Sequence, residues 1–358
     1  MRRSLLYLLL IPWLAFGFAA AVSSCSDSDD DNPPQGNADK SILTALIDSA
    51  TVGYNAAVEG NKPGNYATGS KAALKTALDL AASTKDNAKY TQLEVNNATA
   101  NLRRAVAAFR SGLIQDVSVA NLVAQWKFEG NANDATPNGN NGILKSGPTG
   151  PGTAPGDGGV LPKLVADRFN RPDQAYEFNN GAYIEVPYKA ALNPQAMSIS
   201  LWCRRIDANS DNYLLSLNRW NGFKLQLQGA GKPFLTASTT TTIFDRDAES
   251  GIVEVNKWTH VVTTYVDGTL KFYVNGMLAK AWTDTKGTIK PIPEPVNLCI
   301  GQQLPKDVYN RISASQPADY YTYYGPAFFK GQIDDIRFYN RALTEAEVTS
   351  IYTIENTL

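Results

Sequence analysis

The sequence predicts a mainly β protein, a sandwich of two antiparallel sheets that follows a bundle of three α-helices. Two observations support this fold class. Up to about residue 115, apolar residues recur every three or four positions, as they do along one face of a helix. From Leu122 onward they recur every second position in many short segments separated by turns. A chain of 358 residues is long enough for two such domains.

The charge balance disfavours one class of partner. The chain has 33 Lys and Arg against 34 Asp and Glu, so it offers no basic surface to hold nucleic acid by counterion release. Its single histidine, His260, rules out a cluster of histidine metal ligands and makes any Ser-His or Cys-His nucleophile depend on that residue. Metal chemistry would therefore use carboxylate and carbonyl oxygens.

Residues 1–24 are expected to be a signal peptide, with a charged start at Met1-Arg2-Arg3 and an apolar stretch from Leu5 to Val22. The residues Val22-Ser23-Ser24-Cys25 resemble a bacterial lipobox. This resemblance implies that Cys25 becomes the lipidated first residue of the mature chain, and the alternative is an uncleaved signal anchor. The sequence thus predicts attachment to a membrane through the lipid anchor only.

Residues 25–37 are expected to be a disordered acidic tether. The run from Ser26 to Asp31 carries four aspartates among its six residues, which is typical of a solvated spacer. Next to a lipidated cysteine it also resembles the signal that sends some Gram-negative lipoproteins to the outer surface. We therefore expect the protein in the outer membrane, facing the cell exterior.

Residues 38–115 carry the helical pattern. The breaks fall at Gly60 to Gly64 and at Ser83 to Lys89, and Thr91 with Glu94 forms a capping box that opens the third helix. Short loops imply antiparallel neighbours in a small bundle. The apolar positions of the three helices are Leu43, Leu46, Ile47, Ala50, Tyr54 and Ala57; Leu74, Ala77, Leu78 and Ala81; and Val95, Ala98, Leu102, Val106 and Phe109.

This segment resembles the FIVAR-like three-helix modules of bacterial surface proteins at Gly64-Asn65-Tyr66, Gly69-Ser70-Lys71, Leu74 and Thr91-Gln92-Leu93-Glu94-Val95. The resemblance implies either sugar binding or a spacer. Outside Tyr54, Tyr66 and Tyr90 the bundle has no aromatic constellation, which favours the spacer.

The second part of the chain has the turn chemistry of a β sandwich. Asp267-Gly268 and Asn275-Gly276 are hairpin signals on either side of Leu270 to Val274, and they predict a meander from Trp258 to Trp282. The predicted strands are Leu122 to Phe128, Tyr176 to Phe178, Tyr183 to Val186, Met197 to Arg204, Tyr213 to Leu217, Phe223 to Leu227, Trp258 to Tyr265, Leu270 to Val274, Val296 to Ile300 and Gln332 to Tyr339.

The chain ends in a strand and a short helix. Every second residue from Gln332 should share a face, which would place Asp334 beside the core residues Ile336 and Phe338. Thr344 with Glu347 then forms a capping box for a helix that closes one end of the β structure.

Residues 118–358 contain a series of motifs in the order of a known family. They are Trp126 to Asp134, Tyr176 to Phe178, Ile184 to Pro187, Ser198 to Trp202, Trp258 to Val262, Leu270 to Gly276, Leu298 to Gly301 and Phe329 to Arg337. On these motifs the segment resembles a laminin-G-like domain of the concanavalin A-like lectin/glucanase superfamily. The resemblance implies a jelly roll with one convex and one concave sheet.

The loop from Glu129 to Gly142 is dense in the oxygen ligands that Ca²⁺ prefers. The superfamily resemblance implies a structural calcium at the rim where this loop meets the last strand, with Asp134 and Asp334 as its carboxylate ligands. The alternative is that Asn, Asp and Gly only form turns here and that backbone N–H groups hold Asp334.

Hydrolysis is a second possibility, because some members of the superfamily cleave β-glucans with carboxylates on alternate residues of one strand. The weak catalytic candidates here are Asp245, Asp247 and Glu249. They depart from the family pattern E-x-D-x-E, since the first acid is Asp and Arg246 and Ala248 replace apolar residues. A solvated acidic turn is the alternative.

Carbohydrate binding needs aromatic faces for sugar C–H groups and planar polar side chains for hydroxyls. One candidate is Trp220 with Arg219 and Asn221 at a hairpin tip. The other lies within an apparent insertion from Gln302 to Ala327, where packing of the loop is the alternative. Its tyrosines are Tyr320, Tyr321, Tyr323 and Tyr324.

The remaining reactive side chains have simpler interpretations. His260 lies in a strand with no group in its motif to orient it as a base, so we expect a structural role. Cys203 and Cys299 lie in separate strands of an exported protein, where a disulfide and two buried thiols are equal alternatives.

The sequence therefore favours a surface lipoprotein that binds a glycan, either a polysaccharide or a glycoprotein glycan, without catalysis. A glycoside hydrolase or lyase of the same superfamily is one alternative. A module that docks a protein partner in a surface assembly is another, because fold alone does not decide function.

Overall fold

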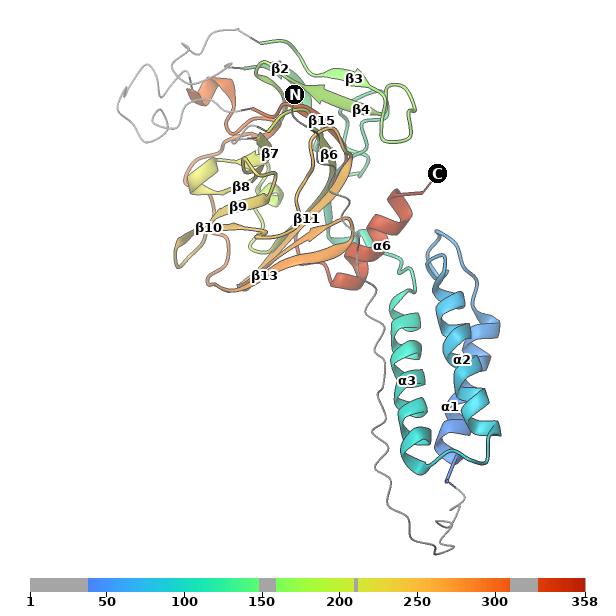
Figure 1. Cartoon of the computed structure of the whole chain (residues 1–358). Coiled ribbons are helices and arrows are strands. Elements are labelled where there is room, and N and C mark those ends of the chain that lie inside the picture. Colours follow the sequence, from blue (N-terminus) through green and yellow to red (C-terminus); the bar gives the residue numbers. More distant parts are fainter. Residues whose placement is uncertain (1–37, 148–158, 209–211, 310–327, 358) are drawn as a thin grey trace, which may run out of the picture.

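A computed structural model describes residues 38–147, 159–208, 212–309 and 328–357. Figure 1 shows a helical bundle and a β sandwich, with the last helix, α6 (Glu345–Glu355), between them. The predicted fold class is confirmed. The predicted signal peptide, tether and lipidated Cys25 lie outside the described residues, and within these no helix is long and apolar enough to cross a membrane.

The bundle consists of α1 (Ser41–Ala56), α2 (Ser70–Asp86) and α3 (Gln92–Ser111). The predicted capping box is confirmed at the start of α3, where Thr91 and Glu94 bond reciprocally. The buried side chains of the bundle form one cluster, which contains Leu43, Ile47, Ala50, Ala57, Leu74, Leu78, Ala81, Val95, Ala98, Leu102 and Phe109. Every one of these belongs to an apolar position that the helical period predicts.

The sandwich has two antiparallel sheets. The eight-stranded sheet runs β13-β12-β11-β6-β15-β4-β3 with β1 paired to β15, and the seven-stranded sheet runs β10-β9-β8-β7-β14-β5-β2. The strands are β1 (Leu122–Trp126), β2 (Ile143–Ser146), β3 (Lys163–Val165), β4 (Ala175–Phe178), β5 (Ala182–Val186), β6 (Met197–Arg205), β7 (Asn212–Leu217), β8 (Phe223–Leu227), β9 (Pro233–Ser238), β10 (Ile243–Asp247), β11 (Thr259–Val266), β12 (Gly268–Val274), β13 (Met277–Thr285), β14 (Leu298–Ile300) and β15 (Gly331–Tyr339).

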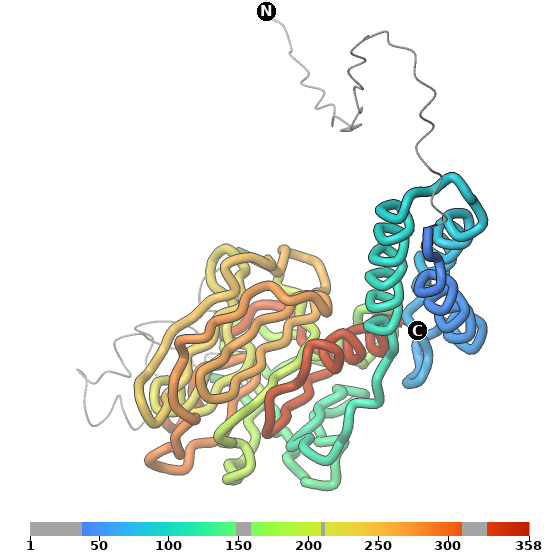
Figure 2. Tube along the Cα trace, turned by 90° about the horizontal axis from the view of Figure 1, so that it is seen from below, coloured from blue at the N-terminus to red at the C-terminus, as the bar shows by residue number. Residues whose placement is uncertain are grey.

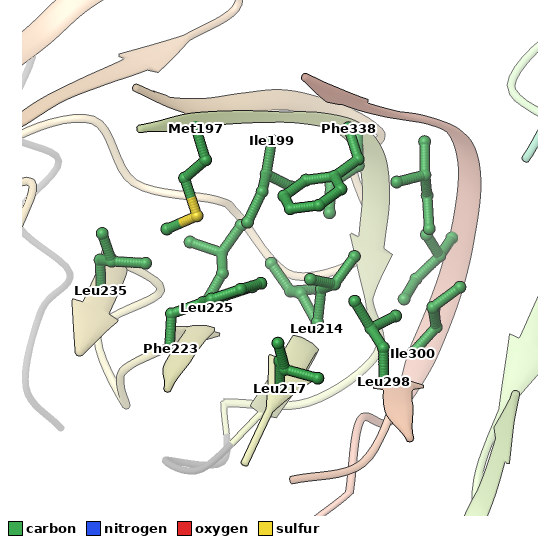
Figure 3. Close-up of a cluster of buried hydrophobic side chains, with 14 of the residues drawn as sticks. Met197, Ile199, Leu214, Leu217, Phe223, Leu225, Leu235, Leu298, Ile300 and Phe338 are labelled. Atoms are coloured by element: carbon green, nitrogen blue, oxygen red, sulfur yellow. The ribbon is translucent and has the colours of Figure 1, made fainter. Parts of the chain in front are cut away.

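The core lies between the inner faces of the two sheets. In Figure 3, Met197, Ile199 and Phe338 of the eight-stranded sheet point toward Leu225 and Leu298 of the seven-stranded sheet. Burial of this apolar area is the main stabilising contribution to the domain. The alternation also decides which side chains face outward, since neighbours of core residues on a strand lie on its opposite face.

The predicted meander is confirmed as β11, β12 and β13. Asn275 and Gly276 both have positive φ angles, of 50° and 75°, which a two-residue hairpin turn of this kind requires. At Gly276 a Cβ atom would also lie 2.8 Å from the ring of Tyr352. Position 276 therefore accepts only glycine unless the surrounding structure rearranges.

The strand β15 contains a bulge that the sequence pattern did not predict. Asp335 has a φ of 45°, and the register to β6 shifts between Asp334 and Arg337. Ile333 and Ile336, three residues apart, both enter the core. The prediction that Asp334 shares a face with Ile336 is therefore wrong, because the bulge turns Asp334 to the outer side of the sheet.

The capping box of α6 is confirmed at Thr344 and Glu347. The helix does not simply close one end of the sandwich. It packs on the outer face of the eight-stranded sheet, and its Val348 and Ile351 share a buried cluster with Val262, Tyr273 and Tyr339. Figures 1 and 2 both show its last turn next to the loop that joins α1 and α2.

Candidate functional site

The outer face of the seven-stranded sheet carries a row of polar side chains. On β8, Phe223, Leu225 and Leu227 enter the core, so Lys224 and Gln226 face outward. The strand register extends this row over neighbouring strands. In the first row, the residues that pair from one strand to the next across the sheet are Glu185, Cys299, Ser216, Lys224, Thr236 and Asp245. In the second row they are Tyr213, Gln226, Phe234 and Asp247.

Lys224 lies at the centre of this face. Its Nζ donates to Oε1 of Gln226 over 2.8 Å. The same nitrogen lies 4.6 Å from the ring centroid of Trp220, 5.2 Å from that of Tyr213 and 5.6 Å from that of Phe234. An ammonium group over aromatic faces is stabilised by the ring quadrupoles. Only 4% of Lys224 is exposed. Its ammonium group is therefore held inside the protein by these contacts and is not free to move in solvent.

Trp220 belongs to the short helical turn η3 (Arg219–Asn221) between β7 and β8. The chain bends there through positive φ angles at Asn218 and Arg219, which brings the indole back over Lys224. Of the three residues that the sequence indicated, Trp220 and Asn221 are half-buried. Arg219 is almost completely buried, with its guanidinium 5.5 Å from the Trp220 ring centroid.

Sequence reasoning missed the residues around Trp220. Lys224, Gln226 and Phe234 were not singled out, although the alternation in Phe223 to Leu227 already places Lys224 and Gln226 on one outward face. Phe234 could not be assigned, because β9 begins at Pro233 and was not predicted as a strand. The predicted tyrosines 320, 321, 323 and 324 lie outside the described residues.

The weak catalytic candidates lie at the edge of the same sheet. Asp245 accepts a hydrogen bond from Oγ1 of Thr236, and Asp247 accepts one from the backbone N–H of Glu249 over 2.8 Å. Glu249 follows the end of β10 with a φ of 51° and pairs with Lys280. The strand therefore carries only two of the three acids, and each acid has a partner of its own.

Asp134 organises its own loop. Its Oδ1 accepts from the backbone N–H groups of Gln125 and Thr136 over 3.0 and 2.9 Å. Its Oδ2 accepts from Oγ1 of Thr136 and from the N–H of Asn140, each over 2.9 Å. Both oxygens are thus used in turn-forming bonds, which is the alternative that the sequence left open.

Asp334 has a different partner, Arg168. The two guanidinium NH groups of Arg168 bond to Asp334 and Asp335, and its Nε donates to the carbonyl of Glu355 over 3.0 Å. Both carboxylates are thus paired with the same guanidinium group. In the part of the chain that the structure describes, no group of three or more His, Cys, Asp or Glu side chains is placed to hold a metal ion.

The charges around Arg168 continue under α6. Glu355 accepts from Nε of Arg337 over 2.6 Å and from Nε1 of Trp202 over 2.9 Å. Burial raises the pKa of Glu355, and burial together with the neighbouring Asp335 carboxylate raises that of Asp334. The cluster therefore anchors α6 to the outer face of the eight-stranded sheet.

His260 adjoins this cluster without forming a catalytic triad. Ser200 Oγ lies 2.8 Å from its Nε2, and a Glu355 oxygen lies 3.9 Å from the same nitrogen. A triad needs the acid on the opposite ring nitrogen. The ring is fully buried, and burial, with the charges of Arg168 and Arg337, lowers the pKa of His260 to about 3. These facts favour the structural role.

Cys203 and Cys299 are free thiols, both buried, one in β6 and one in β14. The two strands belong to different sheets. Burial raises the pKa of Cys203 to about 12 and that of Cys299 well above its ordinary value. Of the two alternatives, the structure shows buried thiols and not a disulfide.

The model of one protein family, the concanavalin A-like lectin/glucanases superfamily, matches residues 178–349. No curated protein matches the chain. One similar solved structure is domain 4 of AbnA, a GH43 extracellular arabinanase from Geobacillus stearothermophilus, in complex with arabinotriose. It has 19% identity and a TM-score of 0.47, with 65% of this chain and 98% of that chain covered.

Two toxin structures are also similar. The binding domain of Paraclostridial Mosquitocidal Protein 1 has 18% identity and a TM-score of 0.44, over 65% of this chain and 52% of that one. The botulinum neurotoxin type G receptor binding domain has 15% identity and a TM-score of 0.42, over 66% and 52%. This chain thus spans about half the length of each toxin structure. Together with the two-sheet sandwich, the family match identifies residues 178–349 as a domain of the concanavalin A-like lectin/glucanase superfamily.

Proposed function

We propose that this protein binds carbohydrate at the cell surface, without cleaving it, through the outer face of the seven-stranded sheet. One observation carries the proposal, the cluster in which Lys224 and Gln226 lie among the rings of Tyr213, Trp220 and Phe234. Rings supply flat apolar surface for sugar C–H groups, and the buried Lys224 ammonium group, bonded to Gln226, holds these rings in position. The superfamily match supports the same class of ligand.

A glycan would meet the exposed parts of this face. Trp220, Phe234 and Asp247 are half-buried and Asp245 is exposed, so rings and hydroxyl acceptors are both within its reach. Surface attachment, through a lipid on Cys25, is the part of the proposal supported by the lipobox resemblance alone.

The test is a glycan-array screen of residues 26–358, run with calcium and again with chelator. Selective binding supports the proposal, and its loss under chelation would link a metal to the site. The variants Trp220→Ala and Phe234→Ala should each weaken binding by about 1–3 kcal/mol, the usual contribution of a stacking ring. Tyr90→Ala, which removes a half-buried ring from the helical bundle, should leave affinity unchanged.

Absence of binding to any glycan would overturn this proposal and favour the docking of a protein partner. The hydrolase alternative has a separate test, the release of reducing sugar from the best ligand. We expect no release above the blank, and no change in the triple variant with Asp245, Asp247 and Glu249 replaced by Ala.

A further inference from the structure

A second concave site lies where the bundle meets α6. It is a groove of about 580 Å³, close to the size of ordinary small-ligand sites. Its walls come from the loop between α1 and α2 and from the last turn of α6, which lie next to each other in Figures 1 and 2. The lining residues are Gly60, Asn61, Ala67, Thr68, Tyr352, Thr353, Asn356 and Thr357.

The chemistry of the groove is neutral and polar. Among the described residues that line it, none is charged. Asn61 and Asn356 supply amides, while the three threonines and Tyr352 supply hydroxyl groups. Neutral donors and acceptors next to an aromatic ring suit a ligand with many hydroxyls and no charge. An anion would find no cation among these lining residues.

The wall from the bundle is rigid. Tyr66 stacks on Phe109 of α3 with ring centroids 4.2 Å apart and planes within 9°. The backbone of the loop is closed by a bond from Tyr66 N–H to the Val58 carbonyl over 2.8 Å and one from Ala67 N–H to the Gly112 carbonyl over 2.8 Å. The loop residues that line the groove therefore have fixed positions before a ligand arrives.

The wall from α6 is equally fixed. The ring of Tyr352 stacks on Trp202 of β6 with centroids 5.8 Å apart. Asn356 Nδ2 donates to the hydroxyl oxygen of Tyr352 over 3.2 Å. Glu355 also anchors this turn to Trp202 and Arg337, which fixes the backbone next to the hydroxyl and amide groups of the wall.

The two walls are joined directly. Asn61 Nδ2 donates to Oγ1 of Thr357 over 2.9 Å. Beyond the groove, the backbone N–H of Gln115 donates to Oγ of Ser350 over 2.8 Å, and Val117 packs with Val348 of α6. These contacts hold the bundle against the helix, so the groove does not need to form on binding.

We infer that this groove is a second, independent binding site for a neutral saccharide. Because α6 covers the outer face of the eight-stranded sheet, the groove lies on the opposite side of the sandwich from the Lys224 face. One molecule with both sites can hold two segments of the same polysaccharide. Binding of the first segment raises the effective concentration of the second, so the polymer is bound more tightly than a single short glycan. The groove also gives the helical bundle a binding role in addition to that of a spacer.

The experiment is hydrogen–deuterium exchange of residues 26–358 with neutral hexasaccharides of glucose, xylose and mannose at millimolar concentration. Protection of residues 58–68 and 349–357 reports the groove, whereas protection of residues 213–247 reports the Lys224 face. The two sites are thereby read separately in one measurement, and the failure of the proposed function does not imply the failure of this inference.

Thr68→Arg and Asn356→Arg fill the groove from its two walls, and both positions are exposed, so the fold should tolerate them. For each variant, the apparent saccharide affinity measured from the protection of the groove segments should fall by about tenfold or more. Thr76→Arg, on an exposed position of α2, is the matched control and should have no effect. Absence of groove protection with all three sugars, or protection that survives both filling variants, overturns the inference.

Discussion

Arg168 bonds to Asp334 across the outer face of the eight-stranded sheet, and the side chains are only 5% and 2% exposed. The two residues are 166 positions apart in the chain. Arg168 also lies 4.6 Å from the ring centroid of Trp202. A buried charge in such a position needs its partner, because removal of one member leaves the other desolvated and unpaired.

The variant Arg168→Met should therefore destabilise the protein by about 3–5 kcal/mol. It removes the donors to Asp334 and Asp335 and those to the Glu355 carbonyl. Chemical denaturation at neutral pH measures the loss. Arg246→Met is the matched control, because solvent screens its ion pair with Asp284 and the variant should lose much less stability. Equal losses in the two variants would contradict a special role for Arg168.

Asp134→Ala should cost about 3 kcal/mol, because four donors in the loop lose a charged acceptor. The loss should be the same in calcium and in chelator if hydrogen bonding is its whole role. Thermal unfolding in both conditions checks this, with the exposed Asp116→Ala as control. A wild-type melting temperature that falls on chelation, together with a variant that no longer responds, would assign a metal to Asp134. Until then calcium binding in the loop from Glu129 to Gly142 stays a prediction.

The capping box of α6 should give the protein a measurable pH dependence. The hydrogen bonds from Arg341 to Glu347, together with those from Thr344, lower the pKa of Glu347 from 4.5 to about 2. The unfolded chain thus takes up this proton more readily than the folded one. The stabilisation is present above pH 4.5 and is lost as the pH falls toward 2.

The variant Glu347→Gln tests this dependence. It should be less stable than the wild type by about 1 kcal/mol at neutral pH, a value kept small because solvent screens the pair. The difference should shrink as the pH falls below 4.5. Denaturation curves across this range provide the measurement, and Glu345→Gln, in the same helical turn, is the control. A difference that stays constant with pH would mean that the carboxylate charge contributes nothing.

Lys224→Met separates the role of the ammonium group from that of its alkyl chain. The variant keeps apolar bulk between the rings of Tyr213 and Trp220 but loses the donor to Gln226. We expect at least about tenfold weaker glycan binding, measured by calorimetry with the best ligand from the array. Lys271→Met on β12 of the opposite sheet should bind normally. Unchanged affinity in a folded Lys224→Met protein would remove this face as the binding site.

The sequence by itself determined the elements that depend on local patterns. The three helices, the capping boxes at Thr91 and Thr344 and the hairpin at Asn275-Gly276 were all predicted, because backbone preferences and side-chain periods act within a few residues. The ordered motifs also indicated the superfamily. Strands that lack these signals were missed, among them β9, which begins at a proline, and β10, whose Arg246 interrupts the apolar alternation.

Only the tertiary structure decided the partners of the charged residues. No residue near Asp334 in the chain indicates that Arg168 is its partner. A one-residue bulge at Asp335 also places Asp334 on the opposite face of the strand from the one that simple alternation predicts. The same holds for Lys224, whose three aromatic neighbours come from β7, the η3 turn and β9. Such clusters form because strands distant in sequence pair side by side. Their chemistry is therefore set by sheet register, which no local pattern contains.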